Sequence, residues 1–152
     1  MRATGVAVRQ LPRLAAAAQA MKVPDGIDWD VADINVTTNG RMCAYERYAS
    51  KLVQSGLTTL LFSVHGHDAR THAQQVGVAE AFEQTTQGIR NCVRLRPAGV
   101  ELGMNITVTK GNHDKQMELA ELAWSLGLRW MNIQFLTPFG RATHYVAPDT
   151  QA

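Results

Sequence analysis

Two histidines separated by one glycine follow a short apolar run, in the order His65-Gly66-His67, with Asp68 and His72 close behind. Imidazole nitrogens and carboxylate oxygens are zinc ligands, and barrel hydrolases bind zinc through a His-x-His pair at the end of a strand. One interpretation is therefore a barrel metallohydrolase with a His65/His67 site. In another, His65 and His72 lie on the substrate side of a pocket and serve as hydrogen-bonding or acid–base groups.

Polar side chains recur at every second position of four short segments of the chain. Alternate residues of a strand point to opposite faces, so each segment divides into a polar and an apolar set. The polar set is Asn35, Thr37, Asn39, Ser63, His65, Asn105, Thr107, Thr109, Asn132 and Gln134. The apolar set, suited to packing under helices, is Val36, Leu60, Phe62, Val64, Met104, Ile106, Val108, Met131, Ile133 and Phe135. A uniformly polar face is typical of a barrel lumen that holds a ligand.

The segments that position these side chains alternate between strand and helix. The expected strands, rich in β-branched and apolar residues, are 34–38, 58–65, 100–109 and 130–136. The expected helices, with apolar residues three or four apart, are 11–21, 44–56, 79–95 and 112–127. Residues 66–77 are expected to form a polar loop, and Asn112 or Asp114 is expected to cap the last helix. The alternation without hairpin signals predicts an α/β fold of parallel strands.

Composition limits the class of protein further. The chain has 152 residues, 45% of them hydrophobic and 18% charged, which is enough for one packed domain. A net charge of +2 is too small to indicate nucleic-acid or membrane binding. No segment approaches the roughly 20 apolar residues of a membrane span, so a cytoplasmic protein is expected. Cys43 and Cys92 have no CxxC-type neighbour and are expected to be reduced and buried.

Five segments in this order resemble the radical SAM superfamily. They are Thr37-Thr38-Asn39-Gly40; Phe62-Ser63-Val64-His65-Gly66-His67-Asp68 with His72; Phe82-Glu83-Gln84-Thr85 with Gly88-Ile89; Asn105-Ile106-Thr107-Val108-Thr109 with Asn112; and Gln134-Phe135-Leu136-Thr137-Pro138-Phe139-Gly140-Arg141-Ala142. The resemblance covers roughly Leu11 to Ala142. It implies a partial parallel (β/α) barrel, TIM-barrel-like, of which this chain matches the third to sixth strands.

The same resemblance implies a cofactor pair and a reaction. Members of the superfamily bind a 4Fe–4S cluster and S-adenosylmethionine (AdoMet). The cluster reductively cleaves AdoMet, and the 5′-deoxyadenosyl radical that results abstracts a hydrogen from the substrate. A radical SAM enzyme is thus the function that the resemblance implies for the intact parent protein.

The cluster-binding segment of the family has no counterpart in this sequence. The family holds its cluster through three cysteines in a CxxxCxxC loop and receives the methionyl amino group on a Gly-Gly-Glu-Pro segment, and neither is present. Both are expected upstream of Met1, because residues 11–21 match the helix that follows the glycine-rich segment. Residues 1–145 are therefore expected to be an incomplete radical SAM core, followed by a tail at 146–152. This chain alone is not expected to bind either cofactor tightly.

The resemblance also implies roles for residues at the strand ends. Ser63 matches a position that contacts the ribose or the carboxylate of AdoMet, and Gln134 lies beside backbone that frames the adenine. The implied cofactor-binding residues are Ser63, Asn105, Thr107, Gln134, Asn39 and Gly40. Plain structural roles remain open for all of them, and turn chemistry in particular for Asn39-Gly40.

The partners of the chain are left open by its sequence. The substrate class is either a peptide or a small molecule. A non-catalytic remnant or split subunit, whose half-barrel docks on a partner chain that supplies the missing strands, is a further alternative. No nucleic acid or membrane partner is expected.

Overall fold

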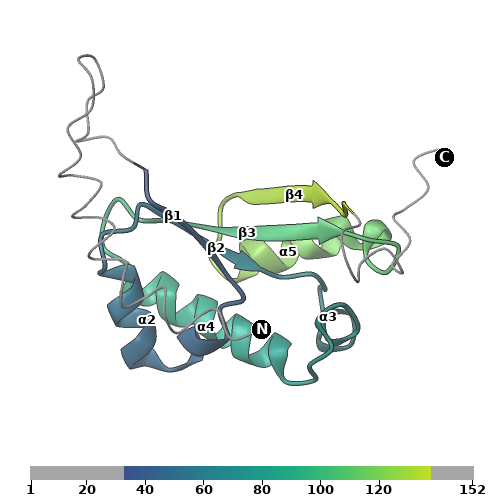
Figure 1. The fold of residues 1–152 in the computed structure, drawn as a ribbon, viewed down its shortest axis with the longest axis horizontal. Helices are drawn as coiled ribbons and strands as arrows, with labels where there is room; N and C mark the ends of the chain where they lie inside the picture. The colour runs from purple at the N-terminus through teal and green to yellow at the C-terminus, as the bar shows by residue number, and fades with distance from the viewer. Residues whose placement is uncertain (1–32, 138–152) are drawn as a thin grey trace, which may run out of the picture.

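The structure is a computed structural model that describes residues 33–137, and its centre is a four-stranded sheet. The strands are β1 (Asn35–Thr38), β2 (Thr59–Ser63), β3 (Glu101–Val108) and β4 (Met131–Phe135). They lie in the order β1-β2-β3-β4, and every neighbouring pair is parallel (Figure 1). This confirms the α/β class and the partial parallel barrel.

Helical segments connect each strand to the next. They are η2 (Arg41–Ala44) and α2 (Glu46–Val53), α3 (Ala69–Val76) and α4 (Ala81–Leu95), and η3 (His113–Lys115) and α5 (Gln116–Ser125). In the view of Figure 1, α5 lies behind the sheet and α2 and α4 lie below it. Within residues 33–137 no helix is long and apolar enough to cross a membrane.

Several sequence predictions fall on parts of the chain that the structure does not describe. The expected helix at 11–21 and the segment Pro138-Phe139-Gly140 lie outside residues 33–137. The division into a core at 1–145 and a tail at 146–152 also reaches beyond these residues, so it stays a prediction.

The polar loop predicted at 66–77 is wrong, because helix α3 occupies most of it. The Asp68 carboxylate caps this helix by accepting a hydrogen bond of 2.7 Å from the Thr71 backbone N–H. Gly77 ends it in the left-handed conformation, with φ at 72°. Hydrophobic periodicity missed α3 because His72 is its only buried residue.

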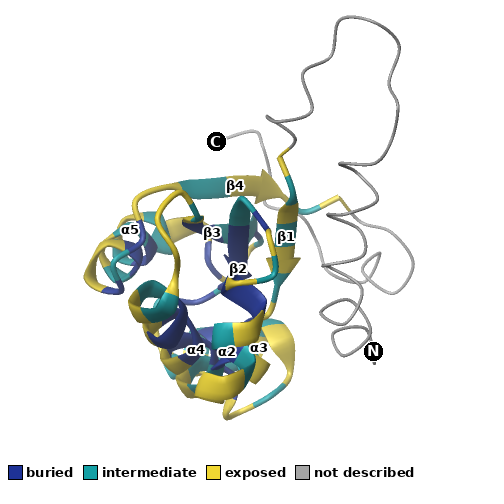
Figure 2. Ribbon diagram, turned by 90° about the vertical axis from the view of Figure 1, so that its left-hand side faces the viewer, coloured by how far each residue is buried: buried dark blue, intermediate teal, exposed yellow. Residues whose placement is uncertain are grey.

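One face of the sheet and the helices enclose the core. Leu60 and Phe62 of β2 and Met104 and Ile106 of β3 are fully buried there. They belong to one cluster with buried residues of α2, α4 and α5, among them Leu52, Ile89 and Leu119. Figure 2 shows this burial between the sheet and the helices. The apolar set predicted by the period-two division therefore packs under helices on β1 to β3, whereas Ile133 and Phe135 of β4 are exposed.

The opposite face is polar toward the carboxyl ends of the strands and again at their amino ends, where Asn35, Thr59 and Glu101 are paired. Ser63, Asn105 and Thr107 are half-buried on it. Nearer the amino ends the same face carries buried Leu61, and Trp130 packs over Gly103. The uniformly polar face predicted from sequence is therefore wrong at one level between the strand ends, where Leu61, Gly103 and Trp130 form an apolar floor.

The closest contact between helices joins η2 to α4 at two glycines. A Cβ on Gly88 of α4 would overlap the Gly40 carbonyl oxygen and lie 2.9 Å from Cys43 Cβ. Gly40 takes a positive φ of 70°, and its carbonyl accepts a hydrogen bond of 2.9 Å from the Cys43 N–H. The Asn39-Gly40 turn can lie against α4 only because Gly88 has no side chain.

Gly88→Ala should lower the free energy of unfolding by about 1–3 kcal/mol, because the added methyl group meets backbone that cannot move aside. The helix propensity of alanine offsets only about 1 kcal/mol of this cost. Urea denaturation followed by circular dichroism measures the change. Arg90→Ala, on the exposed side of the same helix, is the matched control and should differ from wild type by less than about 0.5 kcal/mol. A Gly88→Ala protein as stable as the control would contradict the close packing.

Candidate functional site

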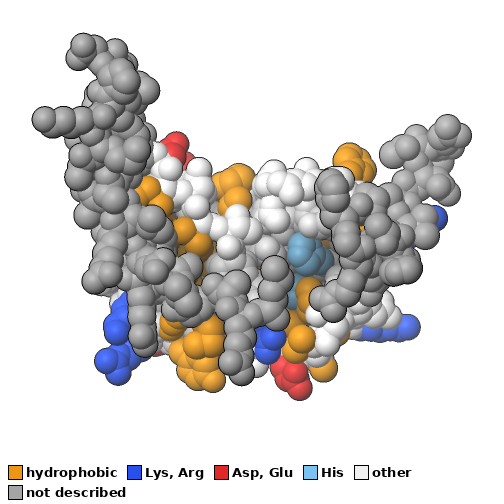
Figure 3. Space-filling model, viewed as in Figure 1, with side chains coloured by type: hydrophobic (Ala, Val, Ile, Leu, Met, Phe, Trp, Pro, Cys, Tyr) orange, Lys and Arg blue, Asp and Glu red, His pale blue; other side chains and the backbone are white. Residues whose placement is uncertain are grey.

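Parallel strands bring their carboxyl ends to one edge of the sheet, and a cavity of about 150 Å³ lies at that edge beside β1 and β2. Its lining residues come from the strand ends and from α3 and α4: Asn39, Arg41, Ser63, His65, His72, Val76, Val78, Ala81 and Thr85. Figure 3 shows histidine side chains at the surface on this side of the molecule. Four of the predicted site residues, Asn39, Ser63, His65 and His72, therefore line one cavity.

The two histidines of the cavity form a hydrogen-bonded pair. The His65 backbone N–H donates to His72 Nδ1 at 3.1 Å, and the Thr107 N–H donates to His65 Nδ1 at 3.1 Å. The two rings stack, with 6.3 Å between centroids and 12° between planes. Because each Nδ1 accepts a hydrogen bond, each neutral ring carries its proton on Nε2. The Nε2–H group is then the polar group of each ring that a ligand in the cavity can use.

Burial keeps both rings uncharged. It lowers the pKa of His72 to about 4, with a smaller contribution from the neighbouring His65 and an opposing one from Glu83. Burial also lowers the pKa of His65 below its ordinary value. At neutral pH both rings are therefore neutral hydrogen-bond donors, and neither is an acid.

Asn112 connects the ends of β2 and β3. Its side chain is fully buried, and its Nδ2 donates to the carbonyl oxygens of His65 at 2.9 Å and Thr107 at 3.0 Å. Its Oδ1 accepts a hydrogen bond of 2.8 Å from the Thr109 N–H. Asn112 occupies the N-cap position of η3 but makes no side-chain capping hydrogen bond, and Lys115 precedes α5, so the prediction that Asn112 or Asp114 caps the last helix is wrong for α5. The Asn112 side chain bonds main-chain groups of the strand ends instead.

Asn39 and Gly40 form a tight turn at the mouth of the cavity. The Asn39 side-chain oxygen accepts a hydrogen bond of 3.2 Å from the Arg41 backbone N–H. The backbone carbonyl oxygen of Asn39 accepts one of 2.8 Å from the Thr85 hydroxyl. These contacts are the turn chemistry that the sequence leaves open for the pair. They also fix Arg41 at the edge of the cavity.

The other three predicted cofactor-binding residues follow on the neighbouring strands. Asn105 of β3 accepts a hydrogen bond of 2.8 Å from Asn132 Nδ2 of β4. Thr107 and Gln134 are paired in the register of these strands, and Gln134 is exposed. With Ser63, they line the polar part of the sheet from β2 to β4. No contact with a cofactor tests their predicted roles.

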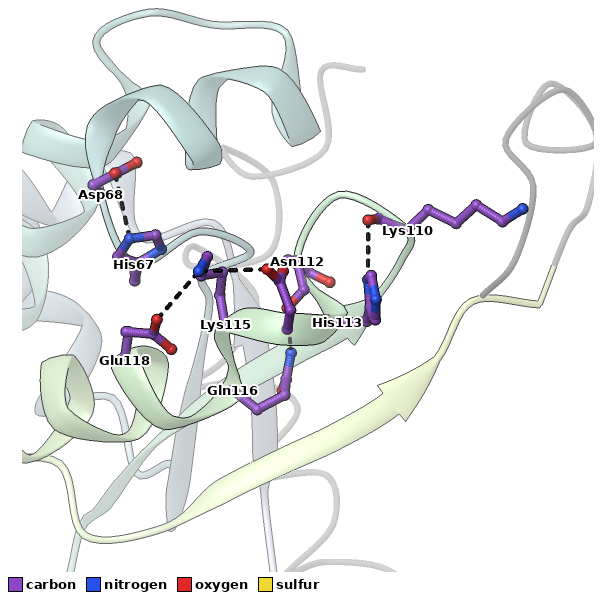
Figure 4. A network of polar contacts seen from close by, with 9 residues as sticks. His67, Asp68, Lys110, Asn112, His113, Lys115, Gln116 and Glu118 are labelled. Carbon is purple, nitrogen blue, oxygen red and sulfur yellow. Dashed lines mark hydrogen bonds and ion pairs between the residues drawn. The ribbon is translucent and has the colours of Figure 1, made fainter. Parts of the chain in front are cut away.

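His67 belongs to a different network from His65. Its Nε2 lies 3.4 Å from the Asp68 carboxylate (Figure 4). Lys115 and Glu118, 3.3 Å apart, lie on the other side of the ring. Within residues 33–137, no three His, Cys, Asp or Glu side chains gather where they could hold a metal ion. Within that part of the chain, the structure therefore does not assemble the set of three ligands that the metallohydrolase interpretation requires.

The two cysteines do not fit the donor set of an iron–sulfur cluster. A cluster of the radical SAM type needs three thiolates, and the sequence contains only two cysteines. Cys43 and Cys92 are buried in the helix–sheet core. A hydrogen bond with the Cys43 thiol and burial raise the pKa of the Cys92 thiol, which disfavours the thiolate that iron requires.

The sequence interpretation overlooked two polar residues of the cavity lining, Arg41 and Thr85, besides the apolar residues Val76, Val78 and Ala81. Thr85 is one helical turn before Gly88 on α4, so the close glycine contact places it beside Asn39. Arg41 follows the Asn39-Gly40 turn directly and was missed because scattered arginines usually lie on solvated surfaces.

Comparison with known proteins gives a consistent set of relatives, although no family model matches the chain. An AdoMet-dependent heme synthase from Nitratidesulfovibrio vulgaris is 35% identical over 107 residues, which are 70% of this chain and 28% of that protein. The AdoMet-dependent heme synthase of Methanosarcina barkeri is 36% identical over 106 residues, 70% of this chain and 29% of the relative. The Oleidesulfovibrio alaskensis protein of the same name is 35% identical over 94 residues, 62% of this chain and 24% of its own length. The matched region thus spans less than a third of each relative.

Asn112→Ala should lower the free energy of unfolding by about 2–4 kcal/mol, because it leaves three main-chain groups at the ends of β2 and β3 without their partner. Equilibrium denaturation measures the loss. Asn35→Ala, at an exposed position of β1, is the control and should change stability by less than about 0.5 kcal/mol. Equal stability of the two variants would refute the bridging role of Asn112.

The stability of the protein should fall as the pH decreases from 6.5 toward 4. In this window the unfolded chain binds a proton on His72, whose pKa in the folded protein is about 4, so the proton favours unfolding. The expected loss is roughly 2 kcal/mol. His72→Gln, which keeps an acceptor for the His65 N–H, should reduce this pH dependence.

Denaturation at pH 7, 6, 5 and 4 measures the pH dependence in both proteins. His113→Gln, which removes an exposed histidine, is the matched control and should retain the wild-type slope. If His72→Gln shows the same slope as the control, His72 is not the buried neutral group described here.

Proposed function

Through its relationship to the AdoMet-dependent heme synthases this chain belongs with the radical SAM enzymes, and from that premise we propose that its strand ends bind AdoMet in such an enzyme. The observation that carries the proposal is the row of polar groups at the carboxyl edge of a parallel sheet. The row consists of side chains on three adjacent strands, namely Ser63, Asn105, Thr107 and Gln134. Ligands of barrels bind at this edge.

The polar groups of the edge match the chemistry of AdoMet. Ser63 offers a hydroxyl group and Gln134 an amide, which suit a ribose and an adenine. The apolar floor of Leu61 and Trp130 lies below them on the same face of the sheet. In this proposal the residues of the chain bind and orient the cofactor.

The cluster is assigned to polypeptide other than these 152 residues, because their two cysteines do not fit it. The match covers 28% of the Nitratidesulfovibrio vulgaris relative. A cluster-binding segment can therefore lie in the other parts of such proteins. In the intact enzyme, AdoMet would supply the radical that abstracts a substrate hydrogen. No step of that chemistry is assigned to Cys43 or Cys92.

Strand β4 has features of a strand that continues into further structure. Among the described residues it pairs with β3 on one side only. Ile133 and Phe135, on the side that faces helices elsewhere in the sheet, are 49% and 69% exposed. This apolar edge supports a further strand and helix at β4, contributed by the same polypeptide or by a partner chain.

A chimeric enzyme tests the proposal. The 107-residue matched segment of the Nitratidesulfovibrio vulgaris heme synthase is replaced by the corresponding residues of this chain. The reconstituted and reduced chimera should form 5′-deoxyadenosine from AdoMet, because the transplanted edge binds the cofactor. Within it, Ser63→Ala should raise the KM for AdoMet about 2- to 10-fold, the loss expected for one hydrogen bond.

The chimera carries its own controls. Iron content and the visible spectrum show whether its cluster has formed. Asn35→Ala, on the same face of the sheet at its amino end, should leave the KM for AdoMet unchanged. A chimera with a full cluster that forms no 5′-deoxyadenosine would overturn the proposed function.

A further inference from the structure

The two thiols of the chain meet in the core, between η2 and α4. Cys43 of η2 is 1% exposed, and Cys92 of α4 is fully buried. A hydrogen bond joins their side chains, so the two sulfur atoms are in contact. They are the only two cysteines of the sequence, and neither has a part in the proposed binding of AdoMet.

The backbones of η2 and α4 approach closely enough for a covalent link between these two residues. A Cβ on Gly88, one helical turn before Cys92, would lie 2.9 Å from Cys43 Cβ. Asn91, the residue of α4 after Arg90, donates hydrogen bonds of 2.9 Å from its Nδ2 to the carbonyl oxygens of Cys43 and Ala44. A disulfide needs its two Cβ atoms about 3.5–4.5 Å apart. Contacts along α4 therefore hold Cys43 at the short range that a disulfide needs.

Burial and local structure together decide which thiol reacts first. The hydrogen bond with Cys43 and burial raise the pKa of the Cys92 thiol, so this thiol stays protonated at neutral pH. Cys92 also lies inside α4, a helix of 15 residues. Cys43 lies in a single 3₁₀ turn of four residues without a side-chain cap, and such short turns open more readily than long helices. Local opening of η2 therefore exposes the Cys43 thiol before that of Cys92.

We propose that Cys43 and Cys92 are a dithiol site that hydrogen peroxide oxidises to a disulfide between η2 and α4. The Cys43 thiolate attacks one peroxide oxygen and becomes a sulfenic acid, while the leaving hydroxide and the proton lost by the thiol form water. When η2 closes, the Cys92 sulfur attacks the Cys43 sulfur. The S–S bond forms, and the sulfenic oxygen leaves with the Cys92 proton as a second water. Two thiols are oxidised, and one peroxide is reduced to two waters.

The disulfide would act on the cavity at the strand ends through η2. This turn follows directly on Asn39-Gly40, and the Gly40 carbonyl oxygen accepts a hydrogen bond of 2.9 Å from the Cys43 N–H. A covalent link from Cys43 to α4 therefore fixes the Asn39-Gly40 turn at the mouth of the cavity. The link also closes a loop of about 50 residues, which restricts the unfolded chain and stabilises the fold.

Oxidation of the full chain by hydrogen peroxide at pH 7, followed by mass spectrometry, tests the site. The intact chain should lose the mass of two hydrogen atoms. Trypsin cleaves after the arginines at 41, 47, 90 and 94, so digestion without reductant should release residues 42–47 linked to residues 91–94. Dithiothreitol should separate the two peptides. The midpoint of urea denaturation should be higher for the oxidised chain than for the reduced chain.

Cys43→Ala and Cys92→Ala are the matched controls, because each leaves one thiol of the pair in place. Neither variant should lose two hydrogens or give the linked peptide, and peroxide should not raise its urea midpoint. Methionine oxidation occurs in the controls as well, so the difference from wild type reports on the cysteines alone. The linked peptide is detected in wild type, so the test does not depend on the folding of either variant.

Three results would overturn the proposal. In the first, the cysteines of the native chain stay reduced or gain oxygen atoms, and the linked peptide forms only in urea. In the second, peroxide links two chains to each other in place of the internal disulfide. In the third, the linked chain has the same urea midpoint as the reduced one. The test needs neither AdoMet nor a cluster, so its outcome is independent of the proposed function.

Discussion

The carboxyl ends of β2 and β3 are joined by side chains where main-chain pairing stops. Val64 makes the last main-chain hydrogen bond of β2, to the Asn105 carbonyl, and beyond it His65 Nδ1 and the Asn112 amide bond the main chain of β3. This replacement lets the two strands separate without leaving buried polar groups unpaired. It also fixes His65, whose backbone N–H donates a hydrogen bond to His72 Nδ1. Because His72 belongs to α3, this bond positions α3 over the cavity. The cavity and its neutral histidines depend on this junction.

The sequence predicts the framework well because helices cover only one face of the sheet, which imposes period two on the strands. Val36, Leu60, Met104 and Ile133 fall on one face whatever the detail of the loops, so the strands and their order along the chain could be assigned. The helix α3 and the bonding of Asn112 could not, because neither has a periodic signal. The helix depends on the Asp68 cap, and Asn112 meets its partner, the His65 carbonyl, 47 positions away in the sequence. Local patterns do not encode contacts of that kind.

The candidate site likewise contains residues that a periodic pattern predicts and residues that only contacts distant in the sequence bring into place. Ser63, His65, Asn105 and Thr107 were found because they alternate with apolar residues on strands. Arg41 lies in a connection, and its place at the cavity follows from the Gly40–Gly88 contact between η2 and α4. The larger hollow of about 370 Å³ near Arg96 and Trp130 lies at the amino end of β3, away from these groups, so volume alone would have pointed to the wrong edge of the sheet.

The central claim is that AdoMet binds at the carboxyl edge of this sheet. Chemical-shift mapping of the isotopically labelled chain with S-adenosylhomocysteine tests it most directly. The account predicts that the perturbed amides cluster at the ends of β1 to β4, around Asn39, Ser63, Thr107 and Gln134. Perturbations confined to the opposite edge, around residues 96–102, or their absence at saturating ligand, would contradict it.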